Sequence, residues 1–361
     1  MNNTQDAGLE VLDFVYRSMK IDECWSIREP RSFTWWGHRL AQRVSVEPVR
    51  RSHGFEVARL SAETDLLRNV QSTQKTADRL AGFNQHASLS AFVWYPDEGR
   101  IRLRCSAGVH AETIETLKPL FSAAVSIQVA DAHVKVDALA TLLGGEPDTS
   151  GHPTGGQRQD IDDMLNVIEQ LFAREGRKAK PFTEADFARA AAVNPPLWLE
   201  AETSGTSLKA LLGTEKYPSA IAVLYVEGSE FHPQLGFGLL MQLNLPITAS
   251  ADQTLVLSHK LNLAEAHAWE TPYFFGAWCP GGNKLSGLVF TAFIPAAVCR
   301  TNLIEAMSLQ MVARVQWACE QIDGGTQGAM LRSDESSRGV LRSRRVGLTS
   351  WPRLLWRWLK A

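Results

Sequence analysis

The chain has 361 residues, of which 45% are hydrophobic and 21% are charged. This balance is typical of globular proteins and excludes a chain that is disordered throughout, while the length favours two domains at about 100–200 residues each. The formal net charge is −2, without the basic excess typical of nucleic-acid binding, so we expect no nucleic acid as a partner.

The sequence also indicates the cellular compartment of the protein. Residues 1–14 contain acids and no basic cluster, unlike a secretory signal. The longest nearly uncharged apolar run, 287–299, is interrupted by Pro295 and is shorter than the ~20 residues of a membrane-spanning helix. The five cysteines lie far apart in the sequence, which favours buried free thiols in a reducing compartment. We therefore expect a cytoplasmic protein.

Composition divides the chain into two modules and a tail. Residues 144–159 hold five glycines and two prolines without apolar periodicity, a composition typical of a flexible linker. This predicts a first module over 1–143 and a second module over 160–323. A flexible segment and a tail then occupy 324–361.

The first module opens with a helix predicted over 6–20, where Leu9, Leu12, Tyr16 and Met19 recur at helical spacing. β-branched and aromatic residues then favour strands. The remaining predicted elements are strands at 33–46 and 55–67, a helix at 76–83, a hairpin of strands 91–95 and 100–107, and a closing helix at 112–143.

The second module shows the same kinds of signal. An apolar stripe predicts a helix over 161–172, and Ser250 with Gln253 forms a capping box before a helix over 251–269. The other predicted elements are a short helix from 183, strands at 197–203, 220–227 and 238–245, a hairpin of strands 273–279 and 285–294, and a closing helix at 299–322.

Both modules thus have the order α-β-β-β-α-β-β-α, which predicts an α+β fold with an antiparallel sheet and flanking helices in each. Short matches in the same order support a tandem duplication with pseudo-twofold symmetry. They pair 93–96 with 277–280, 127–130 with 315–318, and 40–42 with 240–242.

Motifs of catalysis and cofactor binding are missing from the sequence. It contains no phosphate-binding loop, dinucleotide fingerprint, serine-hydrolase elbow, HExxH or paired CxxC. Acids at the start of the helix over 161–172 are explained by the helix dipole. We therefore expect no enzyme, no cofactor and no metal. For the alternative, a site in a cleft between the modules, the candidate polar residues are His38, His232 and Asp252.

Tryptophans supply the candidate partner-binding residues. Trp35 and Trp36 are adjacent in a predicted strand, so one should enter the core while the other faces solvent, a partner or the second module. Residues 338–361 hold seven Lys/Arg and no acid, and a short amphipathic helix is predicted from Ser350. Three docking places are open to this helix: the protein's own core, an anionic membrane surface bound peripherally, or another protein. The candidates are Trp35, Trp36, Trp351, Arg353, Trp356, Arg357 and Trp358.

The element order, the hairpins at 94–96 and 278–280 and the closing helices together resemble the type III secretion chaperone fold, shared by YbjN-type bacterial proteins. The resemblance covers both modules. It implies domains that pair as dimers and bind extended segments of client proteins through hydrophobic surfaces and sheet edges, so that two copies in one chain resemble a covalent pseudo-dimer. The expected function is that of a non-enzymatic protein-binding module, chaperone-like or regulatory, with a client protein as partner. The alternative is an enzyme or small-ligand binding protein.

Overall fold

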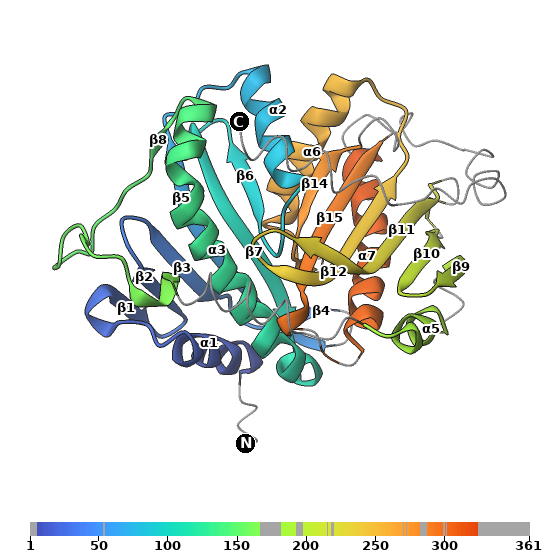
Figure 1. Ribbon diagram of the computed structural model, residues 1–361, viewed down its shortest axis with the longest axis horizontal. Helices are drawn as coiled ribbons and strands as arrows, with labels where there is room; N and C mark the ends of the chain where they lie inside the picture. Colours follow the sequence, from blue (N-terminus) through green and yellow to red (C-terminus); the bar gives the residue numbers. More distant parts are fainter. Residues whose placement is uncertain are drawn as a thin grey trace.

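Two antiparallel sheets with helices packed on them make up the protein (Figure 1), which confirms the predicted α+β class. The structure is a computed structural model. It describes residues 6–52, 55–166, 182–192, 198–214, 216–217, 220–269, 271, 273–281, 287–298, 300 and 302–323. Among these described residues, sheet 1 has nine strands and sheet 2 has six.

The first module begins where predicted, at Asp6, whose carboxylate accepts a hydrogen bond from the backbone N–H of Gly8 at 3.0 Å and so caps the first helix. Its helices are α1 (Ala7–Ser18), α2 (Gln74–Asn84) and α3 (Ile114–Leu143). Its strands are β1 (Ser26–Glu29), β2 (Ser32–Trp36), β3 (Ala41–Val46), β4 (Arg50–Ser52), β5 (Phe55–Arg68), β6 (Ala91–Tyr95) and β7 (Arg100–Val109), followed by β8 (Glu146–Pro147).

The second module has its capping box where predicted, because Ser250 accepts from the backbone N–H of Gln253 at 3.2 Å. Its described helices are α5 (Glu184–Ala192), α6 (Ala251–Glu265) and α7 (Leu303–Ile322). Its strands are β9 (Trp198–Ser204), β10 (Ser207–Leu212), β11 (Ala222–His232), β12 (Gly236–Leu245), β13 (Tyr273–Phe274), β14 (Ala277–Pro280) and β15 (Leu288–Pro295). The predicted helix over 161–172 lies largely outside the described residues.

The two sheets share one strand order. It runs β1-β2-β3-β5-β7-β6 in sheet 1 and β9-β10-β11-β12-β15-β14 in sheet 2. In both modules an asparagine at the same place ties the middle helix to the inner edge strand. Asn84 bonds the backbone N–H and C=O of Phe92, and Asn262 bonds those of Trp278. Four main strands, not the predicted three, precede that helix.

The shared bonds also correct the predicted repeat matches. Because Phe92 and Trp278 are held identically, they are the equivalent residues, and Trp94 is not the counterpart of Trp278. The match of 40–42 with 240–242 joins β3 to β12, which hold different places in the two sheets. The short sequence matches therefore aligned residues that are not structurally equivalent. The topology still supports the two-module arrangement.

The modules pack through reciprocal contacts at their inner edges. Helix α6 packs against β6 of the first module, α2 packs against β14 of the second, and the two helices pack against each other. Figure 1 shows α2 and α6 side by side at the top of the molecule, between the two sheets. This is the pattern of an isologous dimer interface, here within one chain, and it covers the edge strands β6 and β14.

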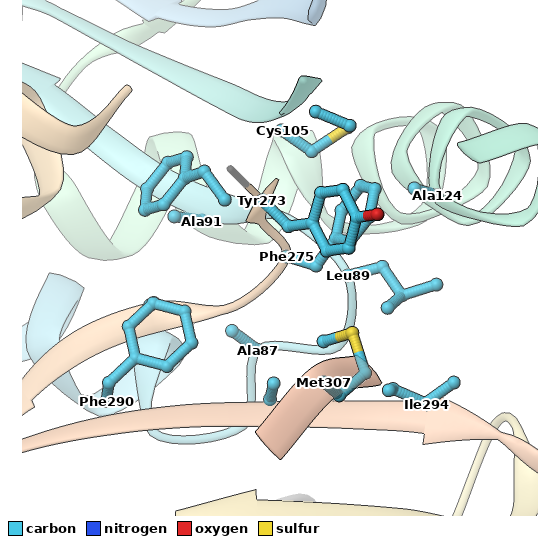
Figure 2. Close-up of a cluster of buried hydrophobic side chains, with 14 of the residues drawn as sticks. Ala87, Leu89, Ala91, Cys105, Ala124, Tyr273, Phe275, Phe290, Ile294 and Met307 are labelled. Atoms are coloured by element: carbon cyan, nitrogen blue, oxygen red, sulfur yellow. The ribbon is translucent and has the colours of Figure 1, made fainter. Parts of the chain in front are cut away.

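One hydrophobic core runs through both modules, so the predicted boundary between them does not separate two cores. Figure 2 shows residues of the α2–β6 connection facing aromatic rings of the second module, with Ala124 of α3 and Met307 of α7 beside them. Strand β13 also pairs with β7, so a strand from the second half completes sheet 1.

The segment predicted as a flexible linker is bonded to the first module along its length. Strand β8 pairs with the end of β5. Beyond it, the backbone N–H groups of Asp148, Ser150 and Asp162 donate to carbonyls of Leu66, Arg39 and Gly37. Backbone groups of this segment that are unpaired locally thus find partners on β5 and in the β2–β3 connection, which fixes its path around the sheet.

The cysteines partly follow the prediction. Cys105, Cys279 and Cys319 are buried free thiols, and burial raises the pKa of Cys105 and Cys319 to about 12. Cys24, in contrast, is exposed, and Cys299 lies outside the described residues. In the part of the chain that the structure describes, no helix is long and apolar enough to cross a membrane.

Candidate functional site

Trp35 and Trp36 point to opposite faces of β2, but both are buried, which corrects the prediction of an exposed partner-binding ring. Trp35 is 0% exposed, in the main hydrophobic core with Leu165. Trp36 is 6% exposed because the 144–166 segment covers it. Its Nε1 donates to Ser150 Oγ at 3.1 Å, and its ring packs edge-on against His152. Neither ring is available to a partner in this structure.

The other predicted residues are not brought together. Trp351, Arg353, Trp356, Arg357 and Trp358 lie outside the described residues. His38 packs against His133, and burial, followed by nearby Arg39, lowers its pKa. His232 accepts from the backbone N–H groups of Gln234 and Leu235 in the β11–β12 turn, and Asp252 lies in the first turn of α6.

A polar cluster does form where His267 of the second module meets sheet 1. Arg104 donates to Tyr95 Oη at 2.9 Å and lies 3.3 Å from His267 Nε2. Burial, followed by nearby arginines, lowers the pKa of His267 to about 4, so its ring is neutral at pH 7. Arg104 also forms an ion pair with Glu63 at 2.6 Å. The charges of this cluster are therefore already compensated.

The outer face of each sheet, opposite its helices, distinguishes the modules. In sheet 1 this face is neutralised by its own ion pairs: Arg104 with Glu63 at 2.6 Å, and Arg102 with Asp65 at 2.7 Å. The Asn84 and Asn262 bonds set the equivalence of strand positions between the sheets. By this equivalence, Arg43 corresponds to Tyr225 and Glu63 to Gln242. Arg104 corresponds to Thr291 and Ser61 to Leu240.

The outer face of β10, β11 and β12 is the candidate site, and we call it the open face. The other side of these strands is buried in the main hydrophobic core, which α5 and α7 also line. On the open face, alternate side chains of β11 and β12 stay partly exposed, as do Ser207 and Lys209 of β10, whereas Leu211 of β10 is 4% exposed. Burial raises the pKa of Tyr225, so its hydroxyl is neutral at pH 7. The open face consists of Ser207, Lys209, Val223, Tyr225, Glu227, Leu240, Gln242 and Asn244.

Acidic side chains border the open face. Glu200 and Glu202 of β9 are exposed and lie opposite Leu211 and Lys209. Glu227 accepts from Ser229 Oγ at 3.0 Å. Among the described residues, none of these three acids forms an ion pair, unlike the acids on the outer face of sheet 1. The border of the open face therefore carries three acids, and the basic side chain of this face, Lys209, lies opposite Glu202.

Strand β9 forms the outer edge of sheet 2, at the opposite end of the molecule from β1 (Figure 1). Within the described part of the chain, its only strand partner is β10. An edge strand of this kind has backbone N–H and C=O groups that another extended segment can pair with. Sequence reasoning predicted β9 but missed the open face, although the alternation of Val223 and Tyr225 with buried Leu224 was its available signal.

The open face offers apolar side chains, an acidic border and a strand edge. No group of three or more potential metal ligands occurs among the described residues. Between the modules, buried apolar side chains occupy the place of the predicted cleft (Figure 2). No family model, curated protein or solved structure matches the chain.

Proposed function

We propose that this is a non-enzymatic protein-binding protein, chaperone-like or regulatory, whose open face and β9 edge bind an extended segment of a client protein in the cytoplasm. The observation that carries the proposal is the contrast between the outer faces of two equivalent sheets. Ion pairs neutralise the first, whereas the second presents Val223, Tyr225 and Leu240 inside a border where three acids accompany one lysine.

The chemistry of the face defines the client segment. Apolar side chains at every second position would cover Val223 and Leu240, because a strand alternates its side chains between two faces. Basic side chains would approach Glu200 and Glu202, and backbone bonds to β9 would add affinity without requiring a fixed sequence. This binding mode is also what the resemblance to secretion chaperones implies.

The alternative function, an enzyme or small-ligand binding protein with a site between the modules, has weaker support. In its best cluster, around Tyr95, Arg104 and His267, the charge of Arg104 is already balanced by Glu63. A ligand would have to break the 2.6 Å ion pair of Arg104 with Glu63 to be bound there.

Fluorescence anisotropy with labelled ten-residue peptides tests the proposal. In one peptide valine and leucine alternate with lysine, and in a second they alternate with glutamate. We expect the full chain to bind the basic peptide, and to bind the acidic peptide at least tenfold more weakly because of Glu200, Glu202 and Glu227.

Leu240→Asp should weaken binding of the basic peptide at least tenfold, since it replaces an apolar side chain of the open face by a charge. Ser61→Asp is the matched control, because Ser61 holds the equivalent position of sheet 1, and it should leave binding unchanged. Equal effects of the two variants, or no binding of either peptide by the full chain and by its Arg353→Glu/Arg357→Glu variant, would contradict the proposal.

A further inference from the structure

We propose that residues 351–360 of the same chain dock on the open face and compete there with the client segment. The inference rests on the proposed function, because it assigns a regulator to the same surface. It commits to one occupant, a segment outside the described residues, on the grounds of shape, charge and reach.

The first ground is the architecture of sheet 2. A sheet commonly has its apolar faces covered by other elements, and among the described helices α5 and α7 line the core on one side of these strands. The open face keeps Val223, Tyr225 and Leu240 partly exposed. The helix predicted from Ser350 has Trp351, Leu354 and Trp358 on one side, which is the apolar surface that such a face lacks.

The second ground is charge. Arg353, Arg357 and Lys360 share the other side of the predicted helix, and residues 338–361 hold no acid. Glu200 and Glu202 are exposed at the border of the open face, without an ion pair among the described residues. The outer face of sheet 1 offers no such attraction, because its acids are paired with Arg102 and Arg104.

The third ground is where the described chain ends. Helix α7 closes beside the β10–β11 connection, where Tyr217 Oη donates to Asp323 at 3.4 Å and Lys216 forms an ion pair with Glu320 at 3.1 Å. The connection from 323 to 351 spans up to roughly 90 Å when extended at ~3.3 Å per residue. Sheet 2 is only about 15 Å wide across β9–β12. A tethered segment has an effective concentration on the order of millimolar, which favours docking within the chain.

Photo-crosslinking in the purified full chain tests the inference. Tyr225 is replaced by p-benzoylphenylalanine, and Arg43, its counterpart on sheet 1, carries the same replacement as a control. After irradiation, mass spectrometry of proteolytic peptides from the monomer band locates the crosslinks. We expect crosslinks from position 225 into 351–360, and none into that segment from position 43.

Charge reversal separates specific docking from chance proximity. Arg353→Glu with Arg357→Glu should lower the crosslink yield at least fivefold, and so should Glu200→Arg with Glu202→Arg. The four changes combined should restore most of the yield, because the charges are again opposite. Unchanged yields in the two double variants, or no recovery in the combined variant, would overturn the assignment.

Other occupants have their own signatures. Crosslinks confined to a dimer band would assign the open face to the segment of a second copy. Co-sedimentation with vesicles of phosphatidylglycerol and phosphatidylcholine, without any crosslink from position 225, would assign the segment to a membrane. Either result overturns the inference. If the chain binds the basic peptide but gives no crosslink, the proposed function stands and only the docking inference fails. If the unmodified chain gives the crosslink but the Arg353→Glu/Arg357→Glu chain does not bind the peptide, only the proposed function is contradicted.

Discussion

Replacing Arg314 by methionine should destabilise the second module more than any surface change. Arg314 and Glu265 form an ion pair at 2.7 Å, with side chains that are 1% and 0% exposed. Glu265 also accepts from Trp278 Nε1 at 2.7 Å, and Arg314 donates to the backbone carbonyl of Tyr273. The guanidinium lies over the ring of Phe290, 3.7 Å from its centroid.

The magnitude follows from what each replacement leaves behind. Arg314→Met leaves a carboxylate without its counter-ion in the core, and breaking a buried pair in this way costs about 3–5 kcal/mol of unfolding free energy. Glu265→Gln keeps an acceptor for Trp278 but leaves the guanidinium unpaired, so a loss of the same size is expected. Glu265→Gln combined with Arg314→Met removes both charges, and the double variant should lose about 2 kcal/mol less than the sum of the two single losses.

Urea unfolding followed by circular dichroism, at several pH values, measures these free energies. Burial raises the pKa of Glu265, and the Arg314 guanidinium opposes that shift. Without Arg314 the folded pKa rises further, so the variant should be relatively more stable below the unfolded pKa of ~4.3 and lose that advantage as the pH increases through the folded value. A loss under 1 kcal/mol for Arg314→Met, or additive single losses, would refute this reasoning.

Three further predictions concern other parts of the fold. Asn84→Ala and Asn262→Ala should each lower the unfolding free energy by about 2–4 kcal/mol, because each leaves a backbone N–H and C=O unpaired in the core; a marked difference in urea unfolding would contradict their equivalence. A thiol reagent should modify Cys24 in the native protein and Cys279 only after denaturation, since burial raises the pKa of Cys279. NMR titration should find His232 neutral down to a pKa of about 4, lowered by burial. Its contribution to stability, complete above the unfolded value of 6.5, should be lost as the pH falls toward 4.

Local signals in the sequence predicted local structure well. The caps at Asp6 and at Ser250 with Gln253 begin α1 and α6 as expected, because both ends of each capping bond lie within one turn of chain. The hairpin turn at 96–99 joins β6 and β7 for the same reason. The α+β class followed from these elements together.

The same local signals could not predict contacts between residues that are distant in the sequence. Trp36 is buried by Ser150 and His152, which local periodicity assigned to a linker. The open face was missed because the exposure of Tyr225 depends on which side of sheet 2 the helices cover, and alternation alone does not say which side that is. Of the predicted binding residues, those at 351–358 lie outside the described residues and stay predictions.

The pairing of β13 with β7 has a consequence for biosynthesis. Arg59 of sheet 1 donates to the carbonyl of Ala266, and Ser106 and Ala107 pair with β13. A nascent chain carrying only the first module leaves these groups without their native partners until about residue 274 has emerged from the ribosome. Folding of the N-terminal half is thus completed late in translation, at a stage when exposed strand edges favour misassembly. A chain cut after residue 143 would lack part of its own native sheet.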